Sequence, residues 1–166
     1  MARATKERHV YAIALGSNRA RRGGESPHDL LRAAIDRLTD ARLTLLARSS
    51  IIESAPIGPS LRRYANAAVL IETEVEPMVL LHQLKAIEGA FGRRSGGQRW
   101  GARPLDLDII LWSGGMWASK SLSIPHPAFR KRDFVLRPLV QIAPDWRDPV
   151  TGYTIRQLLC RMSKFG

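Results

Sequence analysis

The alternation of apolar and polar residues predicts a sheet-forming pattern interrupted by two helices. Helical spacing of apolar residues predicts one helix that starts after Ser26 and another that begins at Pro77 and closes at Gly92. Runs rich in Val, Ile, Leu, Tyr and Ala predict strands, and they lie at 9–15, 43–52, 66–74 and 105–112. The resulting order βαββαβ is typical of an α+β, ferredoxin-like antiparallel sheet with helices on one face.

The last third of the chain predicts a helical addition to this unit. A short strand is expected at 122–124, and helical pieces at 128–132 and 134–142. Thr154 and Gln157 form a capping box in front of a final apolar helix face. The expected architecture is therefore a ferredoxin-like sheet with a C-terminal helical addition.

Length and composition are those of an ordinary globular protein. The chain has 166 residues, of which 45% are apolar and 25% charged. We expect a flexible N-terminus over 1–8 and a single domain over 9–166. No apolar run reaches the roughly 18–20 residues of a membrane span, so we expect a cytoplasmic protein without a membrane partner. We also expect the protein to be a monomer. The single cysteine, Cys160, excludes an internal disulfide framework.

The net charge of +11 indicates an anionic partner or an arginine-rich proteome. The anionic partners that fit a basic protein of this size are a nucleic acid, an anionic membrane and a phosphorylated small molecule. The charge is concentrated in segments, several of which are expected to be loops: 19–22, 62–63, 93–103 and 130–137.

Two carboxylates, Asp106 and Asp108, lie two residues apart in a run that otherwise predicts a buried strand. They should share one strand face, with backbones roughly 6–7 Å apart. Such neighbours repel each other unless a positive charge joins them, and a pair of divalent metal ions would do so. The alternative is a solvated strand edge. The residues expected on the opposite, core-facing side are Leu105, Leu107, Ile109 and Leu111.

Other residues could complete a site for a phosphorylated, ring-containing ligand. Arginines suit phosphate because they stay charged and donate in a planar fork, although they could form a solvated charge run. Trp100 either stacks on a base or covers the core. His126, between two prolines, either donates to phosphate or bonds a backbone carbonyl. Tyr64 and Asn66 could line a pocket for a flat polar ring.

The cations that could contact phosphate fall into two groups. The arginines before the aspartates are Arg93, Arg94, Arg99 and Arg103. The cations Arg130, Lys131 and Arg132 follow His126, and either close over a charged ligand or form a solvated helix face.

Taken together, these motifs resemble one family, the 6-hydroxymethyl-7,8-dihydropterin pyrophosphokinases of folate biosynthesis. The run from Arg99 to Ile110, RWGARPLDLDII, resembles the signature of that family. The resemblance spans nearly the whole chain. Further matching stretches are 11–18, 55–59, 64–68, 124–127, 132–136, 138–139 and 142–144.

The resemblance implies a ferredoxin-like fold and transfer of the pyrophosphoryl group of ATP to the hydroxymethyl oxygen of the pterin, with release of AMP. It implies two Mg²⁺ ions on Asp106 and Asp108, and no nucleic-acid partner. The catalytic residues it implies are Arg103, Asp106, Asp108 and His126. The implied ATP contacts are Glu88, Arg93, Arg94, Trp100, Arg103, Ile109, Ser123, His126 and Arg132. The implied pterin contacts are Gly16, Ser54, Ala55, Ile57, Tyr64, Asn66 and Phe134.

Three positions depart from the pattern of some members of that family. Ser95 and Ser121 stand where some members carry arginine, and Lys85 stands where some carry glutamine. These departures bear on nucleotide affinity more than on the reaction.

Two other interpretations compete with the enzyme. A basic four-stranded α+β module also describes an RNA-recognition fold, which needs exposed aromatics on its central strands. The strand at 66–74 has none, and two aspartates on the strand at 105–112 would repel a phosphate backbone. The second alternative is an inactive homologue. The residues that argue against it are Asp106, Asp108, Arg103 and His126.

Overall fold

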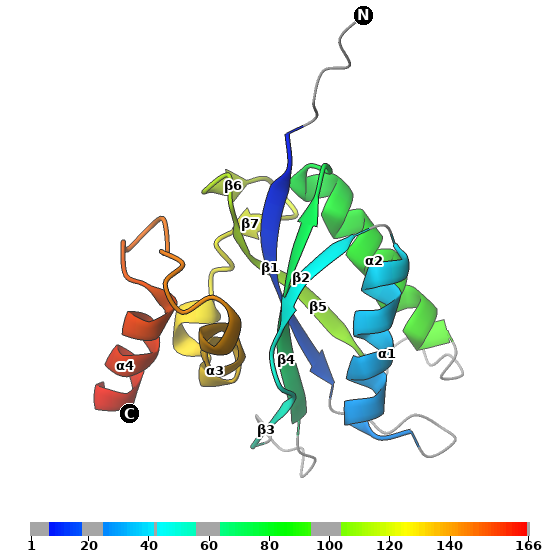
Figure 1. Cartoon of the computed structure of the whole chain (residues 1–166), viewed down its shortest axis with the longest axis horizontal. Helices are drawn as coiled ribbons and strands as arrows, with labels where there is room; N and C mark the ends of the chain where they lie inside the picture. The colour runs from blue at the N-terminus through cyan, green and yellow to red at the C-terminus, as the bar shows by residue number, and fades with distance from the viewer. Residues whose placement is uncertain (1–6, 18–24, 42, 56–63, 94–103, 166) are drawn as a thin grey trace, which may run out of the picture.

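The structure is a computed structural model that describes residues 7–17, 25–41, 43–55, 64–93 and 104–165. Its main sheet is antiparallel, in the order β2-β4-β1-β5, with β3 also paired to β4 (Figure 1). The strands are β1 His9–Ser17, β2 Thr44–Arg48, β3 Ile52–Ser54, β4 Tyr64–Thr73 and β5 Asp106–Trp112. This order confirms the ferredoxin-like fold predicted from the sequence.

The single strand predicted over 43–52 is two strands, β2 and β3, that share β4 as a partner. The break lies at Ser49, whose hydroxyl accepts the Ala68 backbone N–H at 2.9 Å. A side chain that takes a ladder hydrogen bond displaces the backbone from regular pairing. The chain therefore resumes pairing with a shifted register at Ile52, opposite Asn66.

Helices α1 (Pro27–Asp40) and α2 (Pro77–Arg93) cover one face of the sheet. The capping box predicted for α1 is present, because Ser26 Oγ accepts the Asp29 N–H and Asp29 accepts the Ser26 N–H. Both helices present their apolar stripes to the sheet. The core between them and the sheet includes Tyr11, Ile13, Leu15, Leu31, Leu38, Val69, Ile71, Leu80, Leu84 and Leu107.

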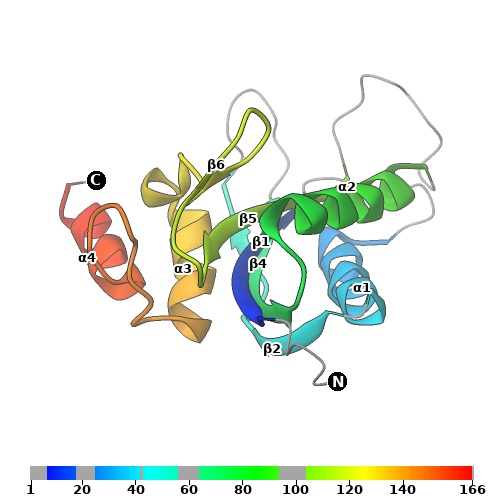
Figure 2. The same cartoon turned by 90° about the horizontal axis from the view of Figure 1, so that it is seen from above.

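The C-terminal addition covers the other face of the sheet, so the fold has two cores rather than helices on one face alone (Figure 2). It consists of a 3-10 turn η1 Phe129–Lys131, α3 Asp133–Ile142 and α4 Ile155–Phe165. The predicted capping box of Thr154 and Gln157 begins α4. The second core includes Ala12, Ala68, Phe129, Leu136, Leu139, Ile155 and Leu158. Within the described residues, none of the helices is long and apolar enough to cross a bilayer.

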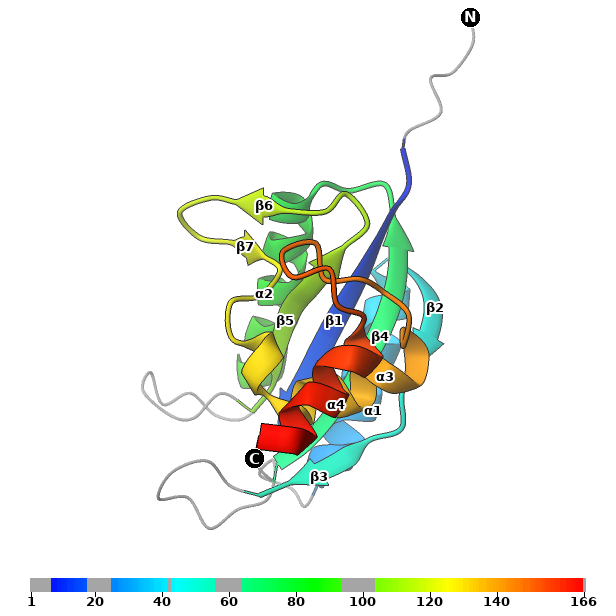
Figure 3. The same cartoon turned by 90° about the vertical axis from the view of Figure 1, so that its left-hand side faces the viewer.

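A β-bulge in β5 corrects one prediction about that strand. Leu107 and Ile109 face the α1–α2 core as expected, but the register shifts after Ile109, and Leu111 packs in the second core instead. The bulge places Ile110 and Leu111 against the C-terminal addition, because one inserted residue reverses the alternation. A separate hairpin follows, formed by β6 Trp117–Ala118 and β7 Ser123–Ile124 (Figure 3). The sequence predicted β7 but not β6.

Candidate active site

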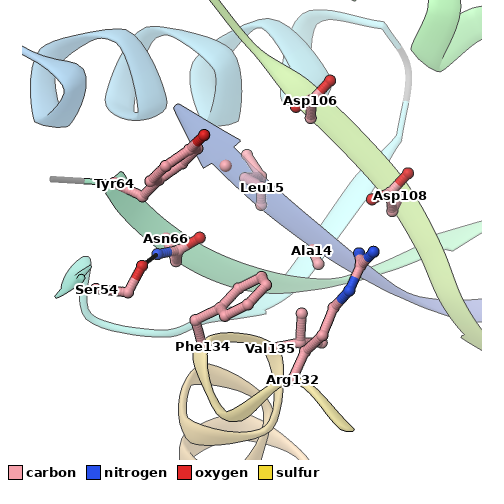
Figure 4. Close-up of a pocket in the computed structure, with 11 residues that line it drawn as sticks. Ala14, Leu15, Ser54, Tyr64, Asn66, Asp106, Asp108, Arg132, Phe134 and Val135 are labelled. Atoms are coloured by element: carbon pink, nitrogen blue, oxygen red, sulfur yellow. Dashed lines mark hydrogen bonds between the residues drawn. The ribbon is translucent and has the colours of Figure 1, made fainter. Parts of the chain in front are cut away.

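A pocket of about 300 Å³ lies on the face of the sheet that carries the C-terminal addition (Figure 4). Its floor follows from the strand register: Gly16 on β1 stands between Asn66 on β4 and Asp106 on β5. Ala14 likewise stands beside Asp108. Gly16 has no side chain between Asn66 and Asp106, and Ala14 has only a methyl group beside Asp108, so β1 leaves a depression here. The pocket is lined by Ala14, Leu15, Gly16, Ser54, Tyr64, Asn66, Asp106, Asp108, Arg132, Phe134 and Val135.

Asn66 forms a polar end of this pocket with a fixed orientation. Its side chain is only 5% exposed, and its Nδ2 donates to Ser54 Oγ at 2.8 Å. The amide group has two donor hydrogens and one acceptor oxygen. Because the nitrogen is held by Ser54, Oδ1 is left on the other side, where it faces the position that a Gly16 Cβ would occupy at 3.6 Å. This end can therefore pair with a ligand that carries N–H groups.

Aromatic side chains supply flat surfaces beside that amide. Tyr64 starts β4 next to Ser54 on β3, and Phe134 stands in the first turn of α3 (Figure 4). The guanidinium carbon of Arg132 lies 5.8 Å from the centre of the Phe134 ring, within range of a cation–π contact. Both aromatics are half-buried. The pocket therefore suits a planar heterocycle with polar edges.

Asp106 and Asp108 lie at the opposite end of the pocket, on one face of β5, as predicted (Figure 4). Asp106 is exposed and Asp108 is half-buried. Oxygen donors from two carboxylates suit Mg²⁺, which takes its remaining ligands from water and substrate phosphates. No cluster of three or more metal-binding side chains occurs among the described residues. The pair thus fits ions that are shared with a phosphorylated substrate, rather than ions enclosed by protein alone.

His126 stands close to these charges in a defined protonation state. Its Nδ1 accepts the Ala128 N–H at 3.2 Å, so in the neutral ring the proton is on Nε2. Burial lowers the pKa of His126 below its ordinary value, Arg132 lowers it further, and Asp108 opposes both. The side chain is thus a neutral donor through Nε2 at pH 7. Donation from Nε2 to a phosphate, one of the two roles predicted for His126, stays a prediction.

His126 does not line the pocket, and neither do Glu88, Ile109 and Ser123. Glu88 is buried on α2, where its carboxylate accepts the Leu107 N–H at 2.8 Å and the Lys85 ammonium at 2.9 and 3.1 Å. Ile109 is 3% exposed in the α1–α2 core. Ser123 is exposed on β7. Glu88 therefore anchors the start of β5 next to Asp106, and a role for Ile109 would have to come from its backbone.

Other predicted residues lie away from the pocket or outside the described residues. Ala55 is described and exposed but does not line the pocket, and Arg93 ends α2 with its side chain outside the described atoms. The predicted contacts that lie outside the described residues are Ile57, Arg94, Trp100 and Arg103. Their roles stay predictions.

The sequence reasoning missed three lining residues, Ala14, Leu15 and Val135. All three are apolar residues within regular elements, so nothing in their type distinguishes them from core positions. The alternation of small residues in β1 at Ala12, Ala14 and Gly16 is the signal that could have located the floor.

Comparison with known proteins identifies relatives of this chain. A family model described as 7,8-dihydro-6-hydroxymethylpterin-pyrophosphokinase (HPPK) matches residues 12–144. The 2-amino-4-hydroxy-6-hydroxymethyldihydropteridine pyrophosphokinase of Haemophilus influenzae is 41% identical over 135 residues, which is 80% of this chain and 81% of that protein. The protein of the same name from Synechocystis is 44% identical over 111 residues; the match covers 67% of this chain and 56% of the relative.

Solved structures of similar fold come from longer chains. The wild-type HPPK-DHPS chain of Plasmodium falciparum aligns with a TM-score of 0.71 at 15% identity, and covers 93% of this chain but 41% of its own. An HPPK-DHPS in complex with substrates aligns with a TM-score of 0.75, also at 15% identity, over 96% of this chain and 44% of its own. At this identity the likeness concerns the fold alone. Since the family model spans most of the sequence, the chain belongs to the 7,8-dihydro-6-hydroxymethylpterin-pyrophosphokinase family.

Proposed function

We propose that this protein transfers the pyrophosphoryl group of ATP to the hydroxymethyl oxygen of 6-hydroxymethyl-7,8-dihydropterin and releases AMP. The observation that carries the proposal is the row formed by Asn66, Gly16 and Asp106 across three strands. This row joins a polar end suited to a flat ring to a carboxylate pair suited to metal-bound phosphates. Membership of the pyrophosphokinase family supports the same reaction.

In this proposal the pterin ring lies between the aromatic side chains, with its amino edge toward Asn66. The oriented Oδ1 of Asn66 accepts the N–H groups of that edge, and Phe134 covers one face of the ring. Gly16 provides room for the ring to reach the sheet. The hydroxymethyl group then points toward Asp106 and Asp108.

The phosphate chain of ATP lies at the aspartate end. Asp106 and Asp108 would hold two Mg²⁺ ions, which neutralise the charge that develops on the transferred group. Arg132 lines the same pocket and donates to phosphate oxygens, and the neutral His126 donates through Nε2. Arg103 is the third predicted donor. No protein nucleophile is needed, because positioning and charge stabilisation account for this type of transfer.

Further details of the proposal rest on the sequence. The expected cytoplasmic location, the monomeric state and the number of metal ions are part of it as predictions. Binding of RNA is not favoured by any described feature of the pocket, where the two aspartates face the ligand.

The test is AMP formation from ATP and Mg²⁺, measured with and without 6-hydroxymethyl-7,8-dihydropterin. We expect pterin-dependent AMP that disappears in the Asp106→Ala/Asp108→Ala variant. Asp145→Asn is a matched control, because Asp145 is an exposed aspartate outside the pocket whose side chain is 85% accessible. Formation of ADP would contradict pyrophosphoryl transfer. Absence of any nucleotide product from folded protein would favour the inactive homologue.

A further inference from the structure

A buried ion pair in the C-terminal addition lies outside the pocket lining, and the proposed chemistry does not use it. Arg130 Nε and Nη2 donate to the two carboxylate oxygens of Asp148 at 2.6 and 2.7 Å. The Asp148 side chain is fully buried and that of Arg130 is 24% exposed. Neither residue lines the pocket. A bidentate pair of this kind fixes the orientation of both partners.

The loop that joins α3 to α4 is organised around this carboxylate. Asp148 also accepts the Val150 N–H at 3.1 Å and the Thr151 hydroxyl at 2.6 Å. The loop closes on itself, since the Asp148 N–H donates to the Tyr153 carbonyl and the Gly152 N–H donates to the Asp148 carbonyl. The carboxylate is thus a fixed anchor, held from several sides.

Arg130 connects that anchor to two candidate site residues through the backbone of η1. The Phe129 N–H donates to the His126 carbonyl at 3.2 Å, and the Arg132 N–H donates to the Phe129 carbonyl at 3.2 Å. Phe129 is fully buried, and the Arg130 guanidinium stacks 4.8 Å from its ring centre. A shift of the turn at Phe129 and Arg130 would therefore move His126 and Arg132 together.

The ion pair also directs the side chains of cations that are adjacent in sequence to different places. Arg130, Lys131 and Arg132 follow one another, yet Arg130 turns to Asp148 while Arg132 turns into the pocket (Figure 4). Replacing a buried ion pair with apolar residues is often neutral or favourable for stability, so stability alone does not account for it. Fixing one arrangement of neighbouring side chains is a role such pairs fulfil in other proteins.

We propose that Arg130 and Asp148 are positioning residues for the proposed pyrophosphoryl transfer, and that they hold the His126–Arg132 turn in the geometry that receives the phosphate chain of ATP. This inference rests on the proposed function. In this role the pair affects the reaction of ATP without contacting the nucleotide. Pterin binding, which depends mainly on Asn66 and Ser54, is expected to be largely independent of the pair.

The test measures kcat/KM for ATP and the KM for pterin in Asp148→Asn, Arg130→Met and the double variant Arg130→Met/Asp148→Leu. We expect kcat/KM for ATP to fall about tenfold or more in all three, because displacements of about 1 Å cost that much or more in transfer reactions. We expect the KM for pterin to change less than threefold. The double variant should recover the melting temperature lost in the single variants, since it leaves no unpaired buried charge.

The controls separate positioning from folding. Asp145→Asn removes an exposed partner of Arg156 at 3.6 Å on the same addition, and should leave both constants unchanged. A rise in the KM for pterin as large as the fall in kcat/KM for ATP would show a purely structural pair and overturn the inference. So would a double variant with wild-type kcat/KM for ATP. A wild-type protein that forms no AMP would overturn the proposed function itself, and with it the role assigned to the pair.

Discussion

The buried carboxylate of Asp148 should make the stability of this protein sensitive to acid. Burial by itself raises the pKa of Asp148, but hydrogen bonds from Arg130, Thr151 and Val150, together with the Arg130 charge, outweigh it and lower the pKa from 3.8 to about 2. Each pKa unit corresponds to about 1.4 kcal/mol of preference for the charged form. The ionised carboxylate therefore contributes about 2 kcal/mol to the free energy of unfolding at neutral pH.

The direction of the pH dependence follows from that lowered pKa. The contribution is fully present above the unfolded pKa of 3.8 and is lost as the pH falls through the folded pKa of about 2. We expect about 2 kcal/mol above pH 5, about 1 kcal/mol at pH 3 and less than about 0.5 kcal/mol at pH 2. The Asp148→Asn variant lacks this titration, because its amide stays neutral throughout.

Urea unfolding of wild type and Asp148→Asn at pH 7, 5, 4, 3 and 2 measures this effect. Other carboxylates titrate in both proteins, so the difference between the two free energies isolates Asp148. The difference should shrink by about 2 kcal/mol between pH 5 and pH 2. Asp145→Asn removes one exposed carboxylate and serves as the control for the loss of a negative charge. A pH-independent difference for Asp148→Asn would refute the assigned ionisation.

Three other predictions concern single contacts. Ser54→Ala removes the acceptor that orients Asn66, so the KM for pterin should rise about 5–10-fold while the KM for ATP is unchanged. Ser54→Thr keeps the hydroxyl and should preserve both KM values. Equal KM values for pterin in the Ala and Thr variants would contradict the role of Ser54 in orienting Asn66. Phe129→Ala empties a fully buried position and should cost about 3–5 kcal/mol in urea unfolding, and a loss below about 1 kcal/mol would be inconsistent with its burial. Glu88→Leu leaves the Leu107 N–H without its acceptor and should cost about 1–3 kcal/mol more than Glu88→Gln; similar melting curves for the two variants would argue against that bond.

The fold could be predicted from the sequence where local signals are strong. The capping boxes at Ser26 and Thr154 and the helical stripe after Pro77 depend on neighbours within one or two turns, and the structure confirms them. The break at Ser49 and the bulge beyond Ile109 depend on hydrogen bonds to other strands, which single-strand periodicity does not encode. A periodic pattern predicts which face a side chain takes only as long as the ladder is regular.

The candidate site was predictable from charge and spacing, but its shape was not. Asp106 and Asp108 stand out as acids in an apolar strand, and Asn66 as an amide in another. Their alignment through Gly16 depends on strand register, and the partner of Arg130 lies 18 residues further along the chain. Nothing near Asp148 in the sequence indicates which of the three consecutive cations at 130–132 forms an ion pair with it.

The packing of helices on both faces of the sheet has a consequence for how the chain folds during its synthesis. The last main strand, β5, ends at Trp112, but the residues that cover the second face, from Phe129 to Leu158, follow it. At about 5–20 residues per second, those residues are made several seconds after the strands are complete. During that interval Ala12, Ala68 and Leu111 present an uncovered apolar surface. Nascent chains stopped after β5 should therefore be the form most prone to aggregation and most dependent on chaperones.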